Sequence, residues 1–204
     1  MSVNSEVEIL ARAGKKGLNV VSLIDLMNLT GKSYGAVRVS ALRLVRKRVL
    51  GPVHGKKGLW FNTLGNQQPE SIIPRVEPDA YITAETALSR YGLITFIPNI
   101  VIAGTPNKSR KINTPYGTIQ LFHIPLKYQT DIYEDTVTGL KTASREKALV
   151  DLFYLKRDSG LSLSSVNLLE QIDKQKLFYL ASSLPIRQKR KFHAYLERGG
   201  NAIK

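Results

Sequence analysis

Hydrophobic residues near the start of the chain recur at the spacing of amphipathic helices. They predict a first helix over Ser5–Ala13, which Gly14 ends, and a second helix over Val20–Leu29. A short turn of sequence Thr-Gly-Lys-Ser follows. Ser33, the last residue of that turn, can cap a third helix that runs to about Arg48. The pattern therefore predicts three successive helices, with a tight turn before the third.

A hairpin is expected directly after these helices. The residues from Pro52 to Phe61 read PVHGKKGLWF, so two strand-like runs flank a tip in which Lys56 and Lys57 lie between glycines. Helix, helix, turn, helix and hairpin is the order of a winged helix-turn-helix domain. We therefore predict such a domain for residues 1–62.

The third helix is expected to have two unlike faces. One is apolar and would pack on the other helices; it comprises Val37, Ala41, Leu44 and Val45. Basic residues lie opposite this stripe or at its edges: Arg38, Arg43, Arg46 and Lys47. Val39 and Leu42 also fall toward the basic side. Three explanations are open for these two residues, namely contact with thymine methyl groups, contact with a second domain, or a pattern out of phase by one residue.

Proline and glycine mark a boundary after the hairpin. Residues 63–78 read TLGNQQPESIIPRVEP, which predicts a linker with little regular structure. Within it, Ile72, Ile73 and Val76 indicate that part of the segment packs against a domain. The linker separates the first domain from a second one over residues 79–204.

Helical and strand-like patterns follow one another in the second region. A helix with a glycine stop is predicted over Tyr81–Ile94, and another over Thr142–Leu155 with Ser144 as its cap. The remaining patterns are strands at 100–103, 111–113 and 118–123 and helices at 163–172, 175–183 and 186–197. The predicted fold class is α+β: a winged helix-turn-helix, then an α+β domain with a small sheet and C-terminal helices.

The distribution of charge favours a polyanionic partner. The chain of 204 residues has 30 Lys and Arg against 16 Asp and Glu, a formal net charge of +14. Residues 1–62 hold 11 of the basic and 3 of the acidic residues, so they carry +8 in less than a third of the length. Double-stranded DNA is the partner that this charge and the predicted domain both suit. The expected DNA contacts are Lys32, Ser33, Tyr34, Arg38, Arg43, Arg46, Lys47, Lys56 and Lys57.

A second basic cluster lies near the end of the chain and consists of Arg187, Lys189, Arg190 and Lys191. Three interpretations are open for it: an auxiliary phosphate patch for DNA or RNA, a contact with an acidic surface, or a solvated face. Charge alone does not choose among them.

The residues give little support to catalysis. Cysteine is absent, the three histidines lack metal-ligand spacing, and no glycine-rich nucleotide motif or nucleophile elbow is present. We therefore expect no catalytic residues, no metal site and no cofactor; a nuclease that binds a metal through carboxylates of residues 79–151 is the enzymatic alternative. No stretch has the length and apolarity of a membrane span or a secretory leader, so we expect a cytoplasmic protein without membrane contact.

Three segments of the second region resemble a known family. They read YITAETALSRYGLI at 81–94, TPYGTIQLFHI at 114–124 and LKTASREKALVDLFYL at 140–155. Together they are similar to the AbiEi family of type IV antitoxins and transcriptional regulators, in which a winged helix-turn-helix commonly precedes this region. Where the family usually has Thr-Pro-Glu-Lys, this chain has Ser-Arg-Glu-Lys at 144–147.

The resemblance implies a repressor that autoregulates its own operon. It also implies an antitoxin that counteracts an AbiEii-type nucleotidyltransferase toxin without a stable complex. Two other functions are kept as alternatives: a stand-alone winged-helix regulator or nucleic-acid-binding module without a toxin, and the metal-dependent nuclease.

Overall fold

The computed structural model describes residues 3–53, 55–65, 68–94, 97–156 and 172–197. The fold is α+β, with helices and two separate β-sheets. The chain divides into two compact units. Unit 1 comprises Met1–Pro78 with Ile112–Ile119, and unit 2 comprises Asp79–Lys111 with Gln120–Lys204.

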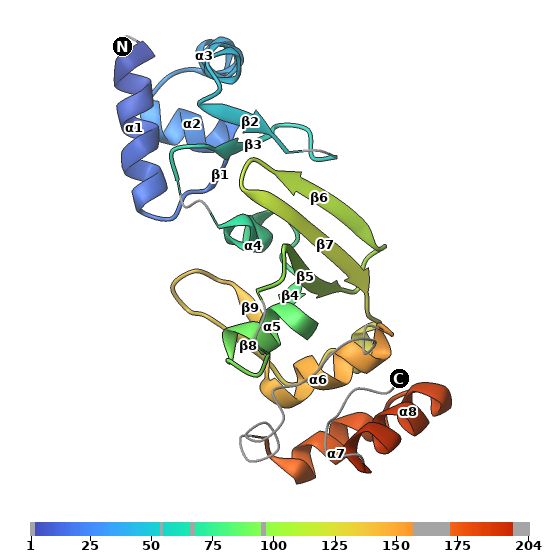
Figure 1. Ribbon diagram of the computed structural model, residues 1–204. Helices are drawn as coiled ribbons and strands as arrows, with labels where there is room; N and C mark the ends of the chain where they lie inside the picture. The colour runs from blue at the N-terminus through green and yellow to red at the C-terminus, as the bar shows by residue number, and fades with distance from the viewer. Residues whose placement is uncertain (1–2, 54, 66–67, 95–96, 157–171, 198–204) are drawn as a thin grey trace. The chain divides into compact units, whose positions relative to one another are not determined.

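Unit 1 begins with three helices and a three-stranded sheet (Figure 1). The helices are α1 (Val3–Lys15), α2 (Leu23–Thr30) and α3 (Tyr34–Arg46). The strands are β1 (Val20–Ser22), β2 (Leu50–Pro52) and β3 (Leu59–Asn62). β3 lies in the middle and pairs antiparallel with both neighbours. The predicted order of three helices and a hairpin is present, with an additional strand between the first two helices.

That additional strand corrects the prediction of a helix over Val20–Leu29. Val20 and Val21 pair with β3, because β-branched side chains suit an extended backbone and a partner strand is available. The helix begins only at Leu23, after a capping box. The Ser22 hydroxyl accepts from the Asp25 backbone N–H at 3.2 Å, and the Asp25 carboxylate accepts from the Ser22 N–H at 2.6 Å.

The third helix is slightly shorter than predicted. Ser33 occupies the N-cap position with an extended backbone, but its side chain makes no capping hydrogen bond. The helix ends at Arg46, with Lys47 as its C-cap, and Arg48 adopts a φ of 59° that turns the chain toward β2. The position of this helix agrees with the prediction, and it ends at Arg46 where the prediction gave about Arg48.

A compact apolar core lies among the helices and the sheet of unit 1. Its buried members are Leu10, Val21, Leu26, Val37, Ala41, Leu44 and Leu50. Asn62 ties strand β3 to α1, because its amide nitrogen donates to the carbonyls of Leu10 at 2.9 Å and Leu18 at 3.1 Å. Burial of these side chains fixes α3 on the other two helices.

The predicted linker is more ordered than its composition indicates. Pro69–Ile72 forms a 3₁₀ turn (η1), and Ile73–Val76 continues it as the short helix α4. The prediction of an irregular segment is therefore wrong for these residues, where a proline lies at one of the first two positions of each short helix. The predicted packing is confirmed, since Ile72, Ile73 and Val76 are all buried.

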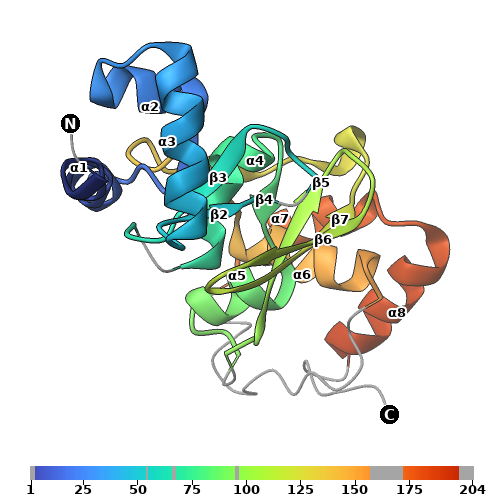
Figure 2. The same cartoon turned by 90° about the horizontal axis from the view of Figure 1, so that it is seen from above.

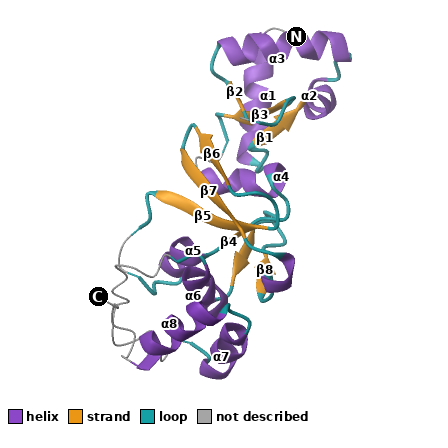
Figure 3. Ribbon diagram, turned by 90° about the vertical axis from the view of Figure 1, so that its right-hand side faces the viewer, coloured by secondary structure: helices purple, strands orange, loops and turns teal. Residues whose placement is uncertain are grey.

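The second sheet has the strand order β6-β7-β5-β4-β9-β8 and belongs to unit 2 except for Ile112–Ile119, which belongs to unit 1. β4 pairs antiparallel with β5 and parallel with β9. Helices α5 to α8 gather on one side of the strands (Figure 3). The strands are β4 (Tyr81–Ile82), β5 (Ile100–Thr105), β6 (Arg110–Thr114), β7 (Gly117–His123), β8 (Ile132–Glu134) and β9 (Lys141–Ala143). The helices are α5 (Ala84–Arg90), the 3₁₀ turn η2 (Leu126–Tyr128), α6 (Arg145–Tyr154), α7 (Lys174–Ser182) and α8 (Ile186–Glu197).

Two predicted helices of unit 2 begin later than expected, because strands precede them. Tyr81–Ile82 forms β4 before α5, and Thr142 and Ala143 belong to β9 before α6. In both places the sheet supplies a partner strand that the local pattern does not show. Ser144 is a true cap, since its hydroxyl accepts from the Lys147 backbone N–H at 3.0 Å.

The other elements predicted for unit 2 are present where the structure describes them, although the helix predicted to reach Ile94 ends at Arg90. The three predicted strands correspond to β5, β6 and β7, and the last two predicted helices correspond to α7 and α8. The helical pattern at 163–172 lies outside the described residues except for Ile172. The local patterns therefore predicted which helices and strands occur in unit 2 more accurately than they predicted where two of the helices begin.

Candidate nucleic-acid interface

Helix α3 has the two faces that the sequence predicts. Val37, Ala41 and Leu44 are each 1% exposed, and Val45 packs half-buried beside them. Figure 2 shows α3 lengthwise, next to β2. Since the predicted stripe is the buried one, the pattern is in phase and the opposite face of α3 is the solvent face.

The solvent face of α3 and its two caps carry most of the predicted contact residues. The exposed ones are Ser33, Tyr34, Arg38, Arg43, Arg46 and Lys47. Their side chains reach from one helix into solvent over about three turns. Such a row of long donors can meet a polyanion along the length of the helix.

Two aliphatic residues lie within this basic face. Val39 and Leu42 are each 57% exposed, so neither is buried in the core. Leu42 lies one helical turn from both Arg38 and Arg46, and Val39 lies one turn from Arg43. The out-of-phase explanation for these residues is wrong, because the apolar stripe faces the core as predicted.

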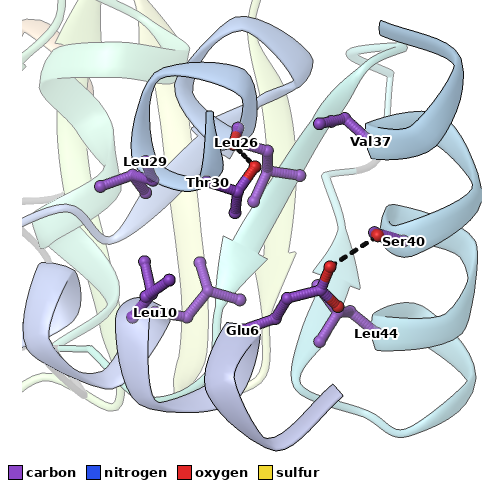
Figure 4. A pocket seen from close by; sticks show the side chains of 9 residues that line it. Glu6, Leu10, Leu26, Leu29, Thr30, Val37, Ser40 and Leu44 are labelled. Atoms are coloured by element: carbon purple, nitrogen blue, oxygen red, sulfur yellow. Dashed lines mark hydrogen bonds between the residues drawn. The ribbon is translucent and has the colours of Figure 1, made fainter. Parts of the chain in front are cut away.

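Lys32 occupies a different environment from the other predicted contacts. Its ammonium forms an ion pair with the carboxylate of Glu6, a residue of α1 that is only 2% exposed. The same Glu6 oxygen accepts a hydrogen bond from the Ser40 hydroxyl at 2.7 Å. Figure 4 shows the Glu6 side chain extending from α1 toward Ser40 of α3, among apolar side chains. Lys32 therefore links the turn before α3 to α1.

This network also reaches the exposed face of α3. Arg43 donates from Nη2 to the Ser40 hydroxyl at 3.1 Å, so Ser40 connects Arg43 to Glu6. Burial raises the pKa of the Glu6 carboxyl, but hydrogen bonds from Lys32 and Ser40 and the charges of Lys32 and Arg43 outweigh it. The net pKa lies below its usual value, so Glu6 is ionised at neutral pH. Its other oxygen, Oε2, has no hydrogen-bond partner among the described residues.

Sequence reasoning missed Glu6. A signal was present, because Glu6 lies one helical turn before Leu10, on the apolar side of the first predicted helix. A carboxylate at such a position needs a hydrogen-bond partner. Its partners are Lys32 and Ser40, which follow Glu6 by 26 and 34 residues in the chain. The periodicity of one helix does not show where these partners lie.

The tip between β2 and β3 presents the two predicted lysines. Gly55 and Gly58 both have a φ of 78°, a conformation that favours glycine and lets the chain turn tightly on either side of the lysines. Lys57 is exposed and Lys56 is half-buried. His54 lies outside the described residues. The loop that forms the tip is closed by a hydrogen bond from the Val53 N–H to the Leu59 carbonyl at 3.1 Å.

The C-terminal basic cluster lies on α8. Arg187, Arg190 and Lys191 are exposed and Lys189 is half-buried. Lys189 and Arg190 line a groove along α8 together with Ile186, His193, Ala194 and Glu197. Phe178 of α7 stacks against His193, with ring centroids 5.9 Å apart. The cluster is thus on the surface of unit 2, mixed with an acidic and an aromatic neighbour.

The acidic side chains of unit 2 that the structure describes include both exposed and buried carboxylates. Glu134 and Asp135 are exposed, whereas the Asp151 carboxylate forms an ion pair with Lys147 and accepts from the Thr83 hydroxyl at 2.7 Å and the Tyr81 hydroxyl at 2.9 Å. Lys147 is 3% and Asp151 1% exposed, so this network belongs to the interior. In the described part of the chain, no group of three or more His, Cys, Asp or Glu side chains is placed to hold a metal ion.

No model of a known protein family matches the chain, and no curated protein is significantly similar to it. None of the helices in the described ranges combines the length and apolarity needed to cross a lipid bilayer.

Proposed function

We propose that unit 1 is a winged helix-turn-helix domain that binds double-stranded DNA. α3 would enter the major groove as the recognition helix, and the β2–β3 hairpin would be the wing. The observation that carries this proposal is the solvent face of α3. Arg38, Arg43 and Arg46 are all exposed there, while the opposite stripe of the same helix is buried.

The predicted contact residues have different roles in this proposal. Arg38, Arg43 and Arg46 would meet base edges, because the planar guanidinium reaches guanine O6 and N7 together. The other predicted donors would hold phosphates: Ser33, Tyr34, Lys47, Lys56 and Lys57. The ion pair with buried Glu6 leads us to leave Lys32 out of the contact set.

We further propose that the protein is a transcriptional repressor of the AbiEi type that acts in the cytoplasm. The support is the resemblance of residues 81–94, 114–124 and 140–155 to that family, together with the proposed DNA-binding unit ahead of them. In this proposal the protein represses its own operon and counteracts an AbiEii-type nucleotidyltransferase toxin, without a stable complex.

DNA binding is tested by titrating the full chain against the duplex upstream of its own gene. Fluorescence anisotropy at several salt concentrations would give the slope of log K against log salt. Each phosphate neutralised by Lys or Arg adds about −0.9 to that slope, so the three lysine contacts predict a slope of about −2.7 or steeper. A flat dependence, or equal affinity for random duplex, would contradict a sequence-specific repressor.

The antitoxin role needs a separate test. A nucleotidyltransferase gene next to the gene of this protein would be expressed with and without it in the same cells. Growth is expected to recover with the intact chain, and also with an Arg46→Ala variant if neutralisation does not need DNA binding. Failure of the intact chain to restore growth would remove the antitoxin role and leave a stand-alone regulator.

A further inference from the structure

The solvent face of α3 has two aliphatic residues in its middle. Val39 and Leu42 are each 57% exposed, whereas Val37 and Leu44 on the other face of the same helix are 1% exposed. Exposed aliphatic side chains contribute little to the fold, so the stability of unit 1 does not explain them. A partner that covers these two side chains would remove their apolar surface from water, which favours binding.

Arginines surround these two aliphatic residues. Leu42 lies four residues from Arg38 and four from Arg46, so all three side chains follow one line along the helix. Val39 lies four residues from Arg43 and three from Leu42. Gly35 and Ala36 are exposed at the start of the helix, and no side chain crowds the space above Gly35. A partner can therefore approach the first turns closely.

We propose that Val39 and Leu42 read the 5-methyl groups of thymines, in the DNA complex on which the proposed function rests. The thymine methyl is the one aliphatic group that base pairs present in the major groove, and the guanine edge beside it offers the acceptors that arginine prefers. A half-site that suits α3 thus has thymines in its middle, flanked by guanines. An unmethylated pyrimidine leaves the two side chains without a contact.

A protein partner fits this face less well. A second copy of the chain placed face to face would bring Arg38, Arg43 and Arg46 of each copy together, and like charges at an interface oppose association. DNA instead supplies negative phosphates around a row of methyl groups. The charge around the aliphatic pair therefore favours a duplex.

The experiment removes one methyl group at a time. The operator is first defined with the full chain by selection from random duplexes and footprinting. Each thymine of the half-site is then replaced by deoxyuridine, which differs only by the methyl group, and the affinity is measured again. At the thymines that Val39 and Leu42 contact, we expect each replacement to weaken binding about fourfold. Replacement of any other thymine should leave the affinity unchanged.

Variants of the two residues assign each methyl group. With Val39→Ala, the loss of affinity caused by deoxyuridine should disappear at one thymine. With Leu42→Ala, it should disappear at a neighbouring thymine. The matched controls are Val137→Ala and Leu126→Ala, because these side chains in unit 2 are 92% and 70% exposed. The controls should keep the full penalty at both thymines. Thermal unfolding of each variant checks that the fold is retained.

The outcomes separate this inference from the proposed function. If the chain selects an operator but no thymine shows a deoxyuridine penalty, the methyl contact is wrong and DNA binding stands. If no operator is selected, the proposed function itself fails. If Val39→Ala or Leu42→Ala changes the oligomeric state in sedimentation and leaves the deoxyuridine penalty in place, the aliphatic pair belongs to a protein interface.

Discussion

Helices α3 and α8 both carry a cluster of basic residues, yet their surroundings differ. On α3 the arginines border two exposed aliphatic residues, and the helix is bound through Ser40 to the buried carboxylate of Glu6. On α8 the cations share a groove with Glu197, and the helix is anchored by Phe192 and Tyr195 against Phe153, at 5.1 and 5.2 Å between ring centroids. Equal charge density therefore does not imply an equal role, and the neighbours of the cations distinguish the two helices.

The strongest test of this difference removes three cations from each helix. In the triple variant Arg38→Ala, Arg43→Ala, Arg46→Ala, we expect operator affinity to fall on the order of a thousandfold, because an arginine that reads a base, as proposed for these three, contributes about 1–3 kcal/mol. The matched triple variant of α8, Arg187→Ala, Lys189→Ala, Arg190→Ala, should lose less than about tenfold, as expected for phosphate contacts at most. Anisotropy titration at fixed salt measures both, and equal losses would show that the helices do not differ in role.

The next largest expected effect is a loss of stability when the packing of α8 is disrupted. Phe192 is fully buried and packs edge-on against Phe153. Phe192→Ala should lower the free energy of unfolding by about 3–5 kcal/mol, since it leaves a cavity in unit 2. Chemical denaturation measures this loss. Operator affinity of the folded fraction should not change, and a parallel loss of affinity would mean that α8 takes part in DNA binding.

The anchoring of α3 predicts a smaller and pH-dependent effect. Glu6→Gln keeps the shape of the side chain but removes its charge, so Lys32 loses its ion-pair partner. We expect unfolding at pH 7 to become easier by about 1–3 kcal/mol. Because the folded pKa of Glu6 is lowered, its stabilisation is present above the unfolded value of 4.5 and is lost as the pH falls through the folded pKa.

The difference between Glu6→Gln and the unaltered protein should therefore shrink in acid. Denaturant titrations at several pH values between about 3 and 7 would measure it. Ser40→Ala provides the control, because it removes the hydroxyl between Glu6 and Arg43 and leaves the carboxylate in place. A difference that stays constant over this range would argue against an ionised Glu6 as the source of the stabilisation.

The hairpin tip predicts the smallest effect. Lys57→Ala removes one exposed cation, so affinity should fall by less than about 1 kcal/mol and to the same extent for all duplexes, with the salt slope closer to zero by about 0.9. The matched control is Lys16→Ala, an exposed lysine of the same unit just after α1. If both variants keep the slope of the unaltered protein, the hairpin does not lie on phosphates.

The candidate site was predicted in most of its residues but not in its internal connections. The exposed residues of α3 and the two lysines of the hairpin follow from periodicity and from turn chemistry, which are local. Lys32 was predicted to contact DNA, because the sequence does not show that Glu6 lies beside it in space. The strand Val20–Ser22 was assigned to a helix for the same reason, since its partner strand lies about 40 residues later.

The sequence by itself determined the succession of helices in unit 1, the buried stripe of α3 and the concentration of positive charge at the front of the chain. These properties depend on residues within one or two helical turns of each other. The tertiary structure decided which apolar residues became strands and which cation was bound by Glu6. Each of those outcomes depends on a partner distant in the chain, and only folding brings the two together.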